Sequence, residues 1–172
     1  TWPGYTGVLQ AMAPGRFAAA LNQAPMRKDV GLYLLDWAAG RVRVWQQPHA
    51  TPAHLLRSVF EQAQSYAEAK RMLTETPVAA PCIFSLAGLH AEEICVIERT
   101  EITAHVHEGR RTAANHWQAP GWDGRARGHD STGRARLMQS VEARLDGRFP
   151  YLEPPIRNAR TRLVMEADAT QG

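Results

Sequence analysis

Alternating apolar and polar positions near the start of the chain predict a β-hairpin. Residues 5–12 alternate with period two, and residues 17–22 form a second apolar run. Between the two runs, Ala13-Pro14-Gly15 is typical of a turn. The hairpin therefore places Asn22 at the end of a strand, where its polar side chain is a candidate for a functional site.

Apolar positions at helical spacing predict three helices after the hairpin. Residues 31–39 are apolar enough for a short buried helix that ends at Gly40. Thr51 is typical of an N-cap, and Ser65 with Glu68 three residues later forms a capping box. The apolar stripes of the second and third helices consist of Leu55, Leu56, Val59, Phe60 and Ala63, and of Ala69, Met72 and Leu73.

The rest of the chain is predicted to contain short strands and one more helix. Strands are expected at residues 79–87, 93–99, 102–107 and 161–167, a polar loop at 117–130 and a helix at 131–145. This order of elements favours an α+β domain with mostly antiparallel sheets. We expect two stacked sheets, with the helices near Val59 and Met72 covering one outer face.

Composition places the chain among single globular domains. It has 172 residues, of which 44% are hydrophobic and 22% charged, and these values exclude a disordered or fibrous chain. No apolar run reaches the roughly 18–20 residues that cross a bilayer, and the first residues lack the regions of a signal peptide. We therefore predict one domain over residues 1–172, no transmembrane segment and a cytoplasmic location.

Charge indicates a nucleic-acid partner only weakly. The net charge is +3, because 20 basic residues oppose 17 acidic ones. Six arginines between Arg110 and Arg136 interleave with Trp117 and Trp122, which fits either a nucleic-acid surface or a solvated loop. Only two of the 20 basic residues are lysines, which indicates a general arginine bias. We favour the solvated loop and keep nucleic-acid binding as the alternative.

Two cysteines and an H-x-H pair could act as nucleophiles or metal ligands. Cys82 and Cys95 lie inside apolar runs, so we expect buried, unmodified thiols. His105 and His107 face the same side of a predicted strand and could share a metal, but we favour the simpler interpretation of two surface histidines on a polar strand face. Residues that could complete such a site are His116 and Glu98. Since nothing fixes a third ligand, we predict neither a metal nor a cofactor.

Catalytic motifs of fixed spacing are absent from the sequence. It contains no P-loop, no G-x-S-x-G elbow and no C-x-x-C pair. Polar residues at the ends of predicted elements remain as candidates, namely Asn22, Asn115 and Arg134. The pattern alone favours turn amides and a helix-surface arginine at these positions.

Several short motifs follow one another in a characteristic order. They are Gly4-Tyr5-Thr6-Gly7-Val8-Leu9, Ala13-Pro14-Gly15-Arg16-Phe17 with Leu21-Asn22, Ser65-Tyr66-Ala67-Glu68-Ala69-Lys70, Cys95-Val96-Ile97 and Asp130-Ser131-Thr132-Gly133-Arg134. Together they resemble the acid ceramidase family and the related N-acylethanolamine acid amidases, in a clan that includes choloylglycine hydrolases and isopenicillin-N acyltransferases. The resemblance extends from Gly4 to about Thr170 and implies an αββα sandwich of the N-terminal-nucleophile hydrolase type.

The resemblance also implies a reaction and a site. Such enzymes cut linear amides with an N-terminal cysteine, whose own α-amino group moves the proton. Asn115 matches the asparagine of the oxyanion hole, Asn22 a second asparagine, and Arg134 an arginine that supports the catalytic cluster. The implied partner is a small-molecule N-acyl amide, no cofactor is implied, and a homo-oligomer is compatible with this class.

The nucleophilic cysteine that the resemblance implies lies upstream of residues 4–22 and is not in this sequence. Cys95 matches a structural cysteine, and Thr1 does not align with the self-cleavage point, although threonine is a known N-terminal nucleophile. We therefore expect most of the C-terminal part of a longer hydrolase, inactive by itself. The alternative is a non-catalytic remnant of the same fold that binds an acyl ligand.

Overall fold

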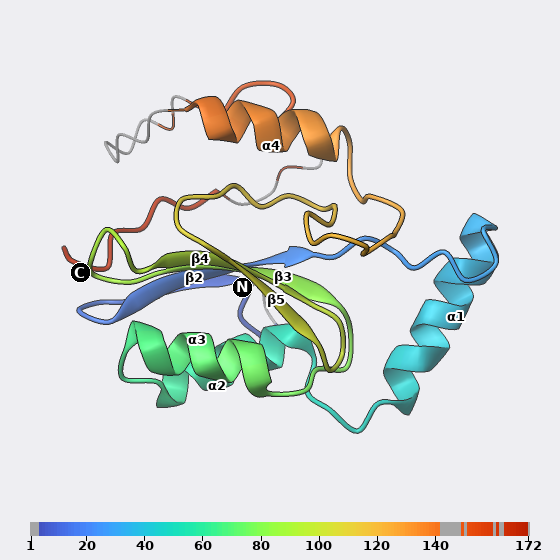
Figure 1. Cartoon of the computed structure of the whole chain (residues 1–172), viewed down its shortest axis with the longest axis horizontal. Coiled ribbons are helices and arrows are strands. Elements are labelled where there is room, and N and C mark those ends of the chain that lie inside the picture. Colours follow the sequence, from blue (N-terminus) through green and yellow to red (C-terminus); the bar gives the residue numbers. More distant parts are fainter. Residues whose placement is uncertain (1–3, 142–148, 150, 160, 162–163, 172) are drawn as a thin grey trace.

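The centre of the described structure is a five-stranded antiparallel sheet in the order β1-β2-β3-β4-β5 (Figure 1). The computed structural model describes residues 4–141, 149, 151–159, 161 and 164–171. The strands are β1 (Gln10–Ala13), β2 (Phe17–Gln23), β3 (Cys82–Ala87), β4 (Ile94–Arg99) and β5 (Ala104–Glu108). Strands that pair are also consecutive in the chain, although three helices separate β2 from β3.

Two helices, α2 (Pro52–Gln62) and α3 (Tyr66–Glu75), cover one face of this sheet (Figure 1). Their apolar stripes pack on the apolar side of the strands, as the helical spacing predicted. Burying one large apolar side chain contributes roughly 1.5–3 kcal/mol, so this layer is the main source of stability. Side chains with no exposed area in this core include Phe17, Leu56, Val59, Leu73, Phe84 and Ile97.

The predicted helix caps differ in how their side chains are used. Ser65 Oγ accepts the Glu68 N–H at 3.2 Å, and Glu68 Oε2 accepts the Gln64 N–H at 2.7 Å, so the capping interaction at α3 is confirmed. Thr51 is the N-cap residue of α2, but its side chain makes no capping hydrogen bond. Its hydroxyl lies 2.7 Å from His54 Nδ1 instead.

The first hairpin is shorter than the alternating pattern predicted. β1 begins at Gln10 and not at Tyr5, because Val8 donates its N–H to the carbonyl of Ala53 in α2, at 2.9 Å, and is thereby drawn away from the strand pair. The turn places Gly15 at a φ of 70°, a left-handed conformation that favours glycine. β2 follows as predicted and delivers Asn22 near its end.

The helix that was predicted to be short and buried is longer and exposed. α1 (Tyr33–Gln46) runs through Gly40 and lies at one side of the molecule, beyond the end of the sheet (Figure 1). Leu34 is 74% exposed and Trp45 is 84% exposed, whereas Asp36 is the residue of this helix that is buried. Apolar composition indicated the helix correctly but not its burial, because burial depends on whether another element packs against it.

Substituting the exposed apolar residues of α1 should leave stability almost unchanged. We expect Leu34→Gln and Trp45→Gln to shift the free energy of unfolding by less than about 0.5 kcal/mol, since neither side chain is buried. Leu56→Ala, in the fully buried core, should cost about 2–5 kcal/mol and serves as the contrast. Urea unfolding measures all three, and a loss above 1 kcal/mol at Leu34 would show that α1 packs against another surface.

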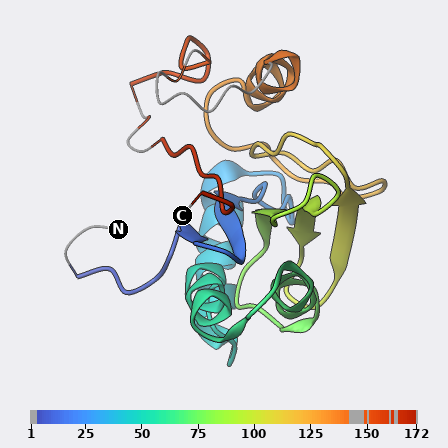
Figure 2. The same ribbon diagram turned by 90° about the vertical axis from the view of Figure 1, so that its left-hand side faces the viewer.

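The second face of the sheet is covered by irregular chain and by α4 (Ser131–Ser140) rather than by another sheet (Figures 1 and 2). The predicted helix at 131–145 ends at Ser140, and its positions 142–145 lie outside the described residues. The predicted strand at 161–167 is wrong for Thr161 and residues 164–167, and residues 162–163 are not described. A short apolar run predicts an extended segment, but strand formation also requires a partner, which the pattern cannot supply.

The α+β class, the antiparallel sheet and the outer helical layer are therefore confirmed. A second stacked sheet is not formed by the residues that the structure describes. In the same described ranges, no helix is long and apolar enough to cross a membrane.

Candidate functional site

A row of side chains crosses the sheet face opposite α2 and α3. The strand register aligns Asn22 with Ile83, Ile83 with Glu98, and Glu98 with His105. Residues paired across neighbouring strands point to the same side, so these four side chains share one face. Phe84, the next residue along β3, belongs to the core on the other face. The polar face is thus set by the alternation of each strand.

The segment between β5 and α4 crosses this face and brings Asn115 to Asn22. Asn22 Nδ2 donates to the carbonyl of Ala113 at 3.3 Å, and Asn115 Nδ2 donates to the carbonyl of Gln23 at 2.8 Å. These reciprocal bonds fix the segment to the end of β2. Each uses one of the two N–H groups of an amide, so each amide retains a second donor.

Arg134 reaches Asn115 from the first turn of α4. Its Nη2 donates to Asn115 Oδ1 at 3.0 Å. The helix begins where Asp130 Oδ1 accepts the Gly133 N–H at 2.9 Å, and this cap fixes the position from which Arg134 extends. Asn22, Asn115 and Arg134 are far apart in the sequence, but the structure brings them together.

Three neighbours of this group were not predicted from the sequence. Ser131 Oγ accepts the backbone N–H of Asn115 at 2.8 Å and lies 2.8 Å from His116 Nδ1. Gly128 lies against Arg134, and a Cβ atom there would approach Nη2 to 2.9 Å. The start of the predicted helix and the glycine-rich loop before it could be recognised in the sequence. Neither pattern shows which residues they contact in the folded chain.

The predicted histidine pair lies beside a buried carboxylate. His105 and His107 share a face, with ring centroids 4.5 Å apart, but His107 is not a surface residue, since its side chain is 9% exposed. Glu98 is fully buried, and its two oxygens accept the N–H groups of Gln118 at 2.8 Å and Ala119 at 2.7 Å. Among the described residues, no three side chains form a metal-ligating group. Glu98 is therefore an anchor for the main chain.

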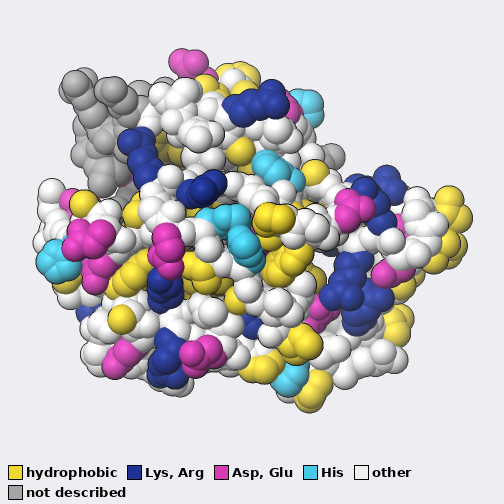
Figure 3. All heavy atoms as spheres, viewed as in Figure 1, with side chains coloured by type: hydrophobic (Ala, Val, Ile, Leu, Met, Phe, Trp, Pro, Cys, Tyr) yellow, Lys and Arg dark blue, Asp and Glu magenta, His cyan; other side chains and the backbone are white. Residues whose placement is uncertain are grey.

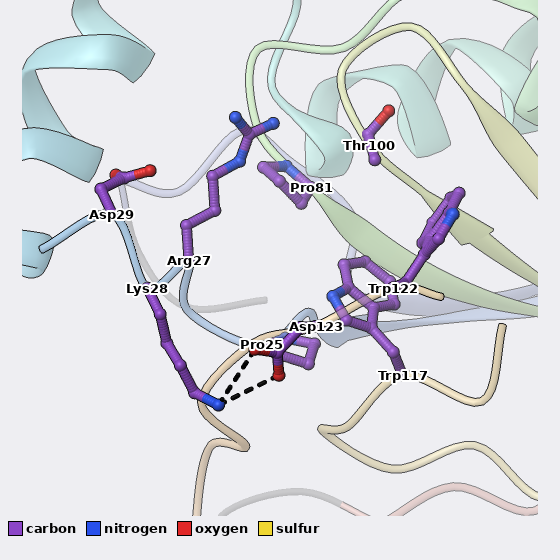
Figure 4. A pocket seen from close by; sticks show the side chains of 9 residues that line it. All are labelled: Pro25, Arg27, Lys28, Asp29, Pro81, Thr100, Trp117, Trp122 and Asp123. Carbon is purple, nitrogen blue, oxygen red and sulfur yellow. Dashed lines mark hydrogen bonds and ion pairs between the residues drawn. The ribbon is translucent and has the colours of Figure 1, made fainter. Parts of the chain in front are cut away.

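A cavity of about 310 Å³ opens where β2 and β4 end (Figure 4). Trp117 and Trp122 form part of its wall, with ring centroids 5.0 Å apart and planes at 89°. At its edge, Lys28 Nζ donates to Asp123 Oδ1 at 3.0 Å (Figure 4). None of the three candidate residues, Asn22, Asn115 and Arg134, lines this cavity.

Several arginines of the 110–136 stretch hold the fold together. Arg110 donates to the carbonyl of Val141 at 2.7 Å, Arg125 donates to that of Gly31 at 3.1 Å, and Arg134 binds Asn115. Figure 3 shows basic and acidic side chains interspersed on the face in view. These contacts favour a structural role for these arginines.

Both cysteines are buried, as predicted, in the core under α3. Cys82 and Cys95 are each 1% exposed, unpaired, and on the opposite side of the sheet from Asn22. Burial raises the pKa of both thiols, against the opposing influence of Arg99 on Cys82 and of a Tyr66 hydrogen bond on Cys95. A nucleophilic cysteine needs a lowered pKa, so neither thiol fits that role.

Thiol labelling under native conditions should be slow at both positions. A raised pKa leaves little thiolate near pH 8, and burial blocks the reagent, so we expect the reaction of Cys82 and Cys95 to follow unfolding. Reaction with a disulfide reagent, followed by mass spectrometry of the labelled peptides, separates the two sites. Labelling in denaturant supplies the fast reference. Native labelling of either peptide at the reference rate would contradict the prediction.

The fold is that of a solved amidase. The N-acylethanolamine-hydrolyzing acid amidase ortholog of Caenorhabditis elegans aligns with a TM-score of 0.62 over 92% of this chain and 68% of that chain, at 22% sequence identity. The chain therefore has the fold of the N-terminal-nucleophile hydrolases, as the sequence motifs implied.

Several acid ceramidases are similar in sequence to part of this chain. The human protein is 37% identical over 100 residues, and those of Heterocephalus glaber and Mus musculus are 36% identical over 99 and 38% over 96 residues. The match covers 58% of this chain and 24% of the human relative, so the matched part spans about a quarter of that protein. No protein-family model matches. The predicted resemblance to acid ceramidases is confirmed over this stretch.

Proposed function

We propose that this chain provides the oxyanion-binding part of an amide hydrolase of the N-terminal-nucleophile cysteine class. The observation that carries this proposal is the meeting of Asn22, Asn115 and Arg134 on one face of a sheet with the fold of an amidase. The names of the similar proteins indicate N-acyl amides as the substrate class.

The reaction requires donors that stabilise a negatively charged oxygen. A cysteine thiolate attacks the carbonyl carbon, and the π electrons of the carbonyl move to its oxygen, which then accepts N–H groups of Asn22 and Asn115. When the tetrahedral intermediate collapses, the C–N bond breaks and the amine leaves with a proton from the α-amino group of the cysteine. Water then hydrolyses the thioester and releases the carboxylic acid.

Arg134 has a supporting role in this scheme. Its guanidinium donates to Asn115 Oδ1, the acceptor end of the amide, which directs the NH2 end away from Arg134. A cationic partner at the oxygen also polarises the amide and strengthens its N–H donors. We therefore assign orientation of Asn115 to Arg134, and no direct contact with substrate.

We further propose that the nucleophile lies outside these 172 residues. Cys82 and Cys95 lie in the core beneath α3, on the other side of the sheet from Asn22, so their sulfur atoms cannot reach a substrate bound at the amides. The isolated chain should therefore show no turnover. Unpaired thiols are also compatible with a cytoplasmic location, which we keep as part of the proposal.

Hydrolysis of an N-acyl amide by the whole protein tests the function. We expect release of a fluorogenic amine from such a substrate, and loss of this activity after iodoacetamide treatment, because the thiolate is the proposed nucleophile. Binding of the acyl amide without turnover would contradict the enzyme and favour an acyl-binding remnant. Nucleic-acid binding that weakens steeply with salt would favour the remaining alternative.

A further inference from the structure

We propose that Glu98 is a positioning residue for Asn115, an inference that rests on the proposed hydrolase function. Glu98 projects from β4 toward the segment that carries Asn115, and its side chain has no exposed area. Both carboxylate oxygens accept main-chain N–H groups of that segment, from Gln118 at 2.8 Å and Ala119 at 2.7 Å. This one carboxylate thus ties β4 to the segment.

A buried carboxylate is retained in a fold only where strong partners offset its lost hydration. For Glu98 those partners are the two main-chain N–H groups, and His107 Nε2 lies further away, at 3.4 Å from Oε2. Hydrogen bonds to an ionised acceptor are stronger than those between neutral groups. Loss of the carboxylate would therefore act first on the main chain of residues 118–119.

The contact is transmitted to Asn115 through a closed loop. Gln118 Nε2 donates to the carbonyl of Thr112 at 2.7 Å, which closes residues 112–118 around Asn115. Glu98 fixes the base of this loop, and Asn22 holds its other side through the Ala113 carbonyl. In the sheet, Asn22 and Glu98 are separated only by Ile83. Glu98 therefore sets where Asn115 lies relative to Asn22, which matters because oxyanion donors must converge on one oxygen.

The next residue in the strand provides a matched control. Arg99 is also fully buried, but it points to the other face and donates to the carbonyls of Thr76 at 3.0 Å and Leu73, at the end of α3. Arg99→Lys should lower the midpoint of unfolding, because it weakens the hydrogen bonds to the end of α3. It should leave the position of the 112–118 loop, which carries Asn115, unchanged. Glu98→Gln keeps the size of the side chain but replaces one acceptor oxygen with an NH2 group, which cannot accept from a main-chain N–H.

Kinetics of the whole protein on an N-acyl amide substrate test this assignment. We expect Glu98→Gln to lower kcat by about 10- to 100-fold, with little change in KM, because small displacements of a catalytic donor have effects of this size. Arg99→Lys should leave kcat unchanged per folded molecule. Equal loss of kcat in both variants would overturn the proposal, since it would reflect general destabilisation.

A double-mutant cycle tests whether Glu98 acts through Asn115. In an Asn115→Ala background, Glu98→Gln should have almost no further effect on kcat, whereas independent roles would give multiplicative losses. Multiplicative losses would therefore overturn the positioning role.

Hydrogen exchange separates this inference from the proposed function. Amides in residues 112–122 should exchange at least tenfold faster in Glu98→Gln than in wild type, and the Arg99→Lys variant should not show this. Unchanged exchange would overturn the role of Glu98 even in an active enzyme. If the wild type hydrolyses no amide, the proposed function fails, and exchange alone decides whether Glu98 holds the loop. If Glu98→Gln does not fold, rapid exchange of the Gln118 and Ala119 amides in the wild type would overturn the proposal.

Discussion

Asn115→Ala should lower kcat for N-acyl amide hydrolysis by about 10²–10³-fold, the loss expected for one oxyanion donor. The substitution removes the Nδ2 group that the proposed mechanism directs at the oxyanion, and KM should change little because the donor acts mainly in the transition state. The measurement is steady-state kinetics on the whole protein with an N-acyl amide substrate.

Two comparisons make this result specific. Asn115 also binds the carbonyl of Gln23 and receives Arg134, so circular dichroism and the melting temperature must show that the variant is folded. Gln139→Ala removes an amide from an exposed position on α4 and should leave kcat unchanged. A folded Asn115→Ala enzyme with wild-type kcat would remove Asn115 from the oxyanion site, even if the fold assignment stands.

The sequence pattern alone predicted the elements whose apolar side follows directly from alternating or helical spacing. β2, β3, β4 and the helices α2 and α3 follow alternating or helical spacing, and Ser65 caps α3 as its sequence indicates. These elements bury one apolar side against each other, so the sequence pattern and the tertiary structure carry the same information. The prediction was correct for the elements that pack their apolar sides directly against one another.

Prediction was wrong where the outcome depends on a distant partner. α1 has an apolar surface with little packed against it, and residues 164–167 have an apolar pattern without a strand partner. Glu98 is the opposite case, a polar residue whose burial the sequence pattern does not predict. A glutamate within a strand gives no indication that it will be fully buried, because its partners are main-chain N–H groups about 20 positions later.

The candidate site illustrates a third situation. Periodicity placed Asn22 at a strand end, but only the resemblance to acid ceramidases connected it with Asn115 and Arg134. The contacts of Asn22 and Asn115 are to main-chain carbonyls of the opposite segment, which carry no signature in the side-chain sequence. The structure supplies the connection through register and helix capping, and the catalytic roles remain our proposal.

Arg99 is the residue whose loss should reduce stability most among the polar positions considered. Its side chain is fully buried and donates to three main-chain carbonyls, those of Leu73, Thr76 and Thr103. Two of these belong to the end of α3, where unpaired carbonyls carry the negative end of the helix dipole. Burial lowers the pKa of Arg99, because desolvation disfavours the charged form of its guanidinium.

We expect Arg99→Met to lower the free energy of unfolding by roughly 3 kcal/mol, because methionine fills the space but leaves buried carbonyls without a donor. For a chain of this size, that corresponds to a fall in melting temperature of about 6–12 °C. Arg71→Met on α3 is the matched control, since Arg71 is exposed and pairs with Glu75 at 3.5 Å within the helix. That change should stay within about 0.5 kcal/mol. Urea unfolding at neutral pH measures both losses. Similar losses for the two variants would show that the buried hydrogen bonds of Arg99 contribute no more to stability than the exposed ion pair of Arg71.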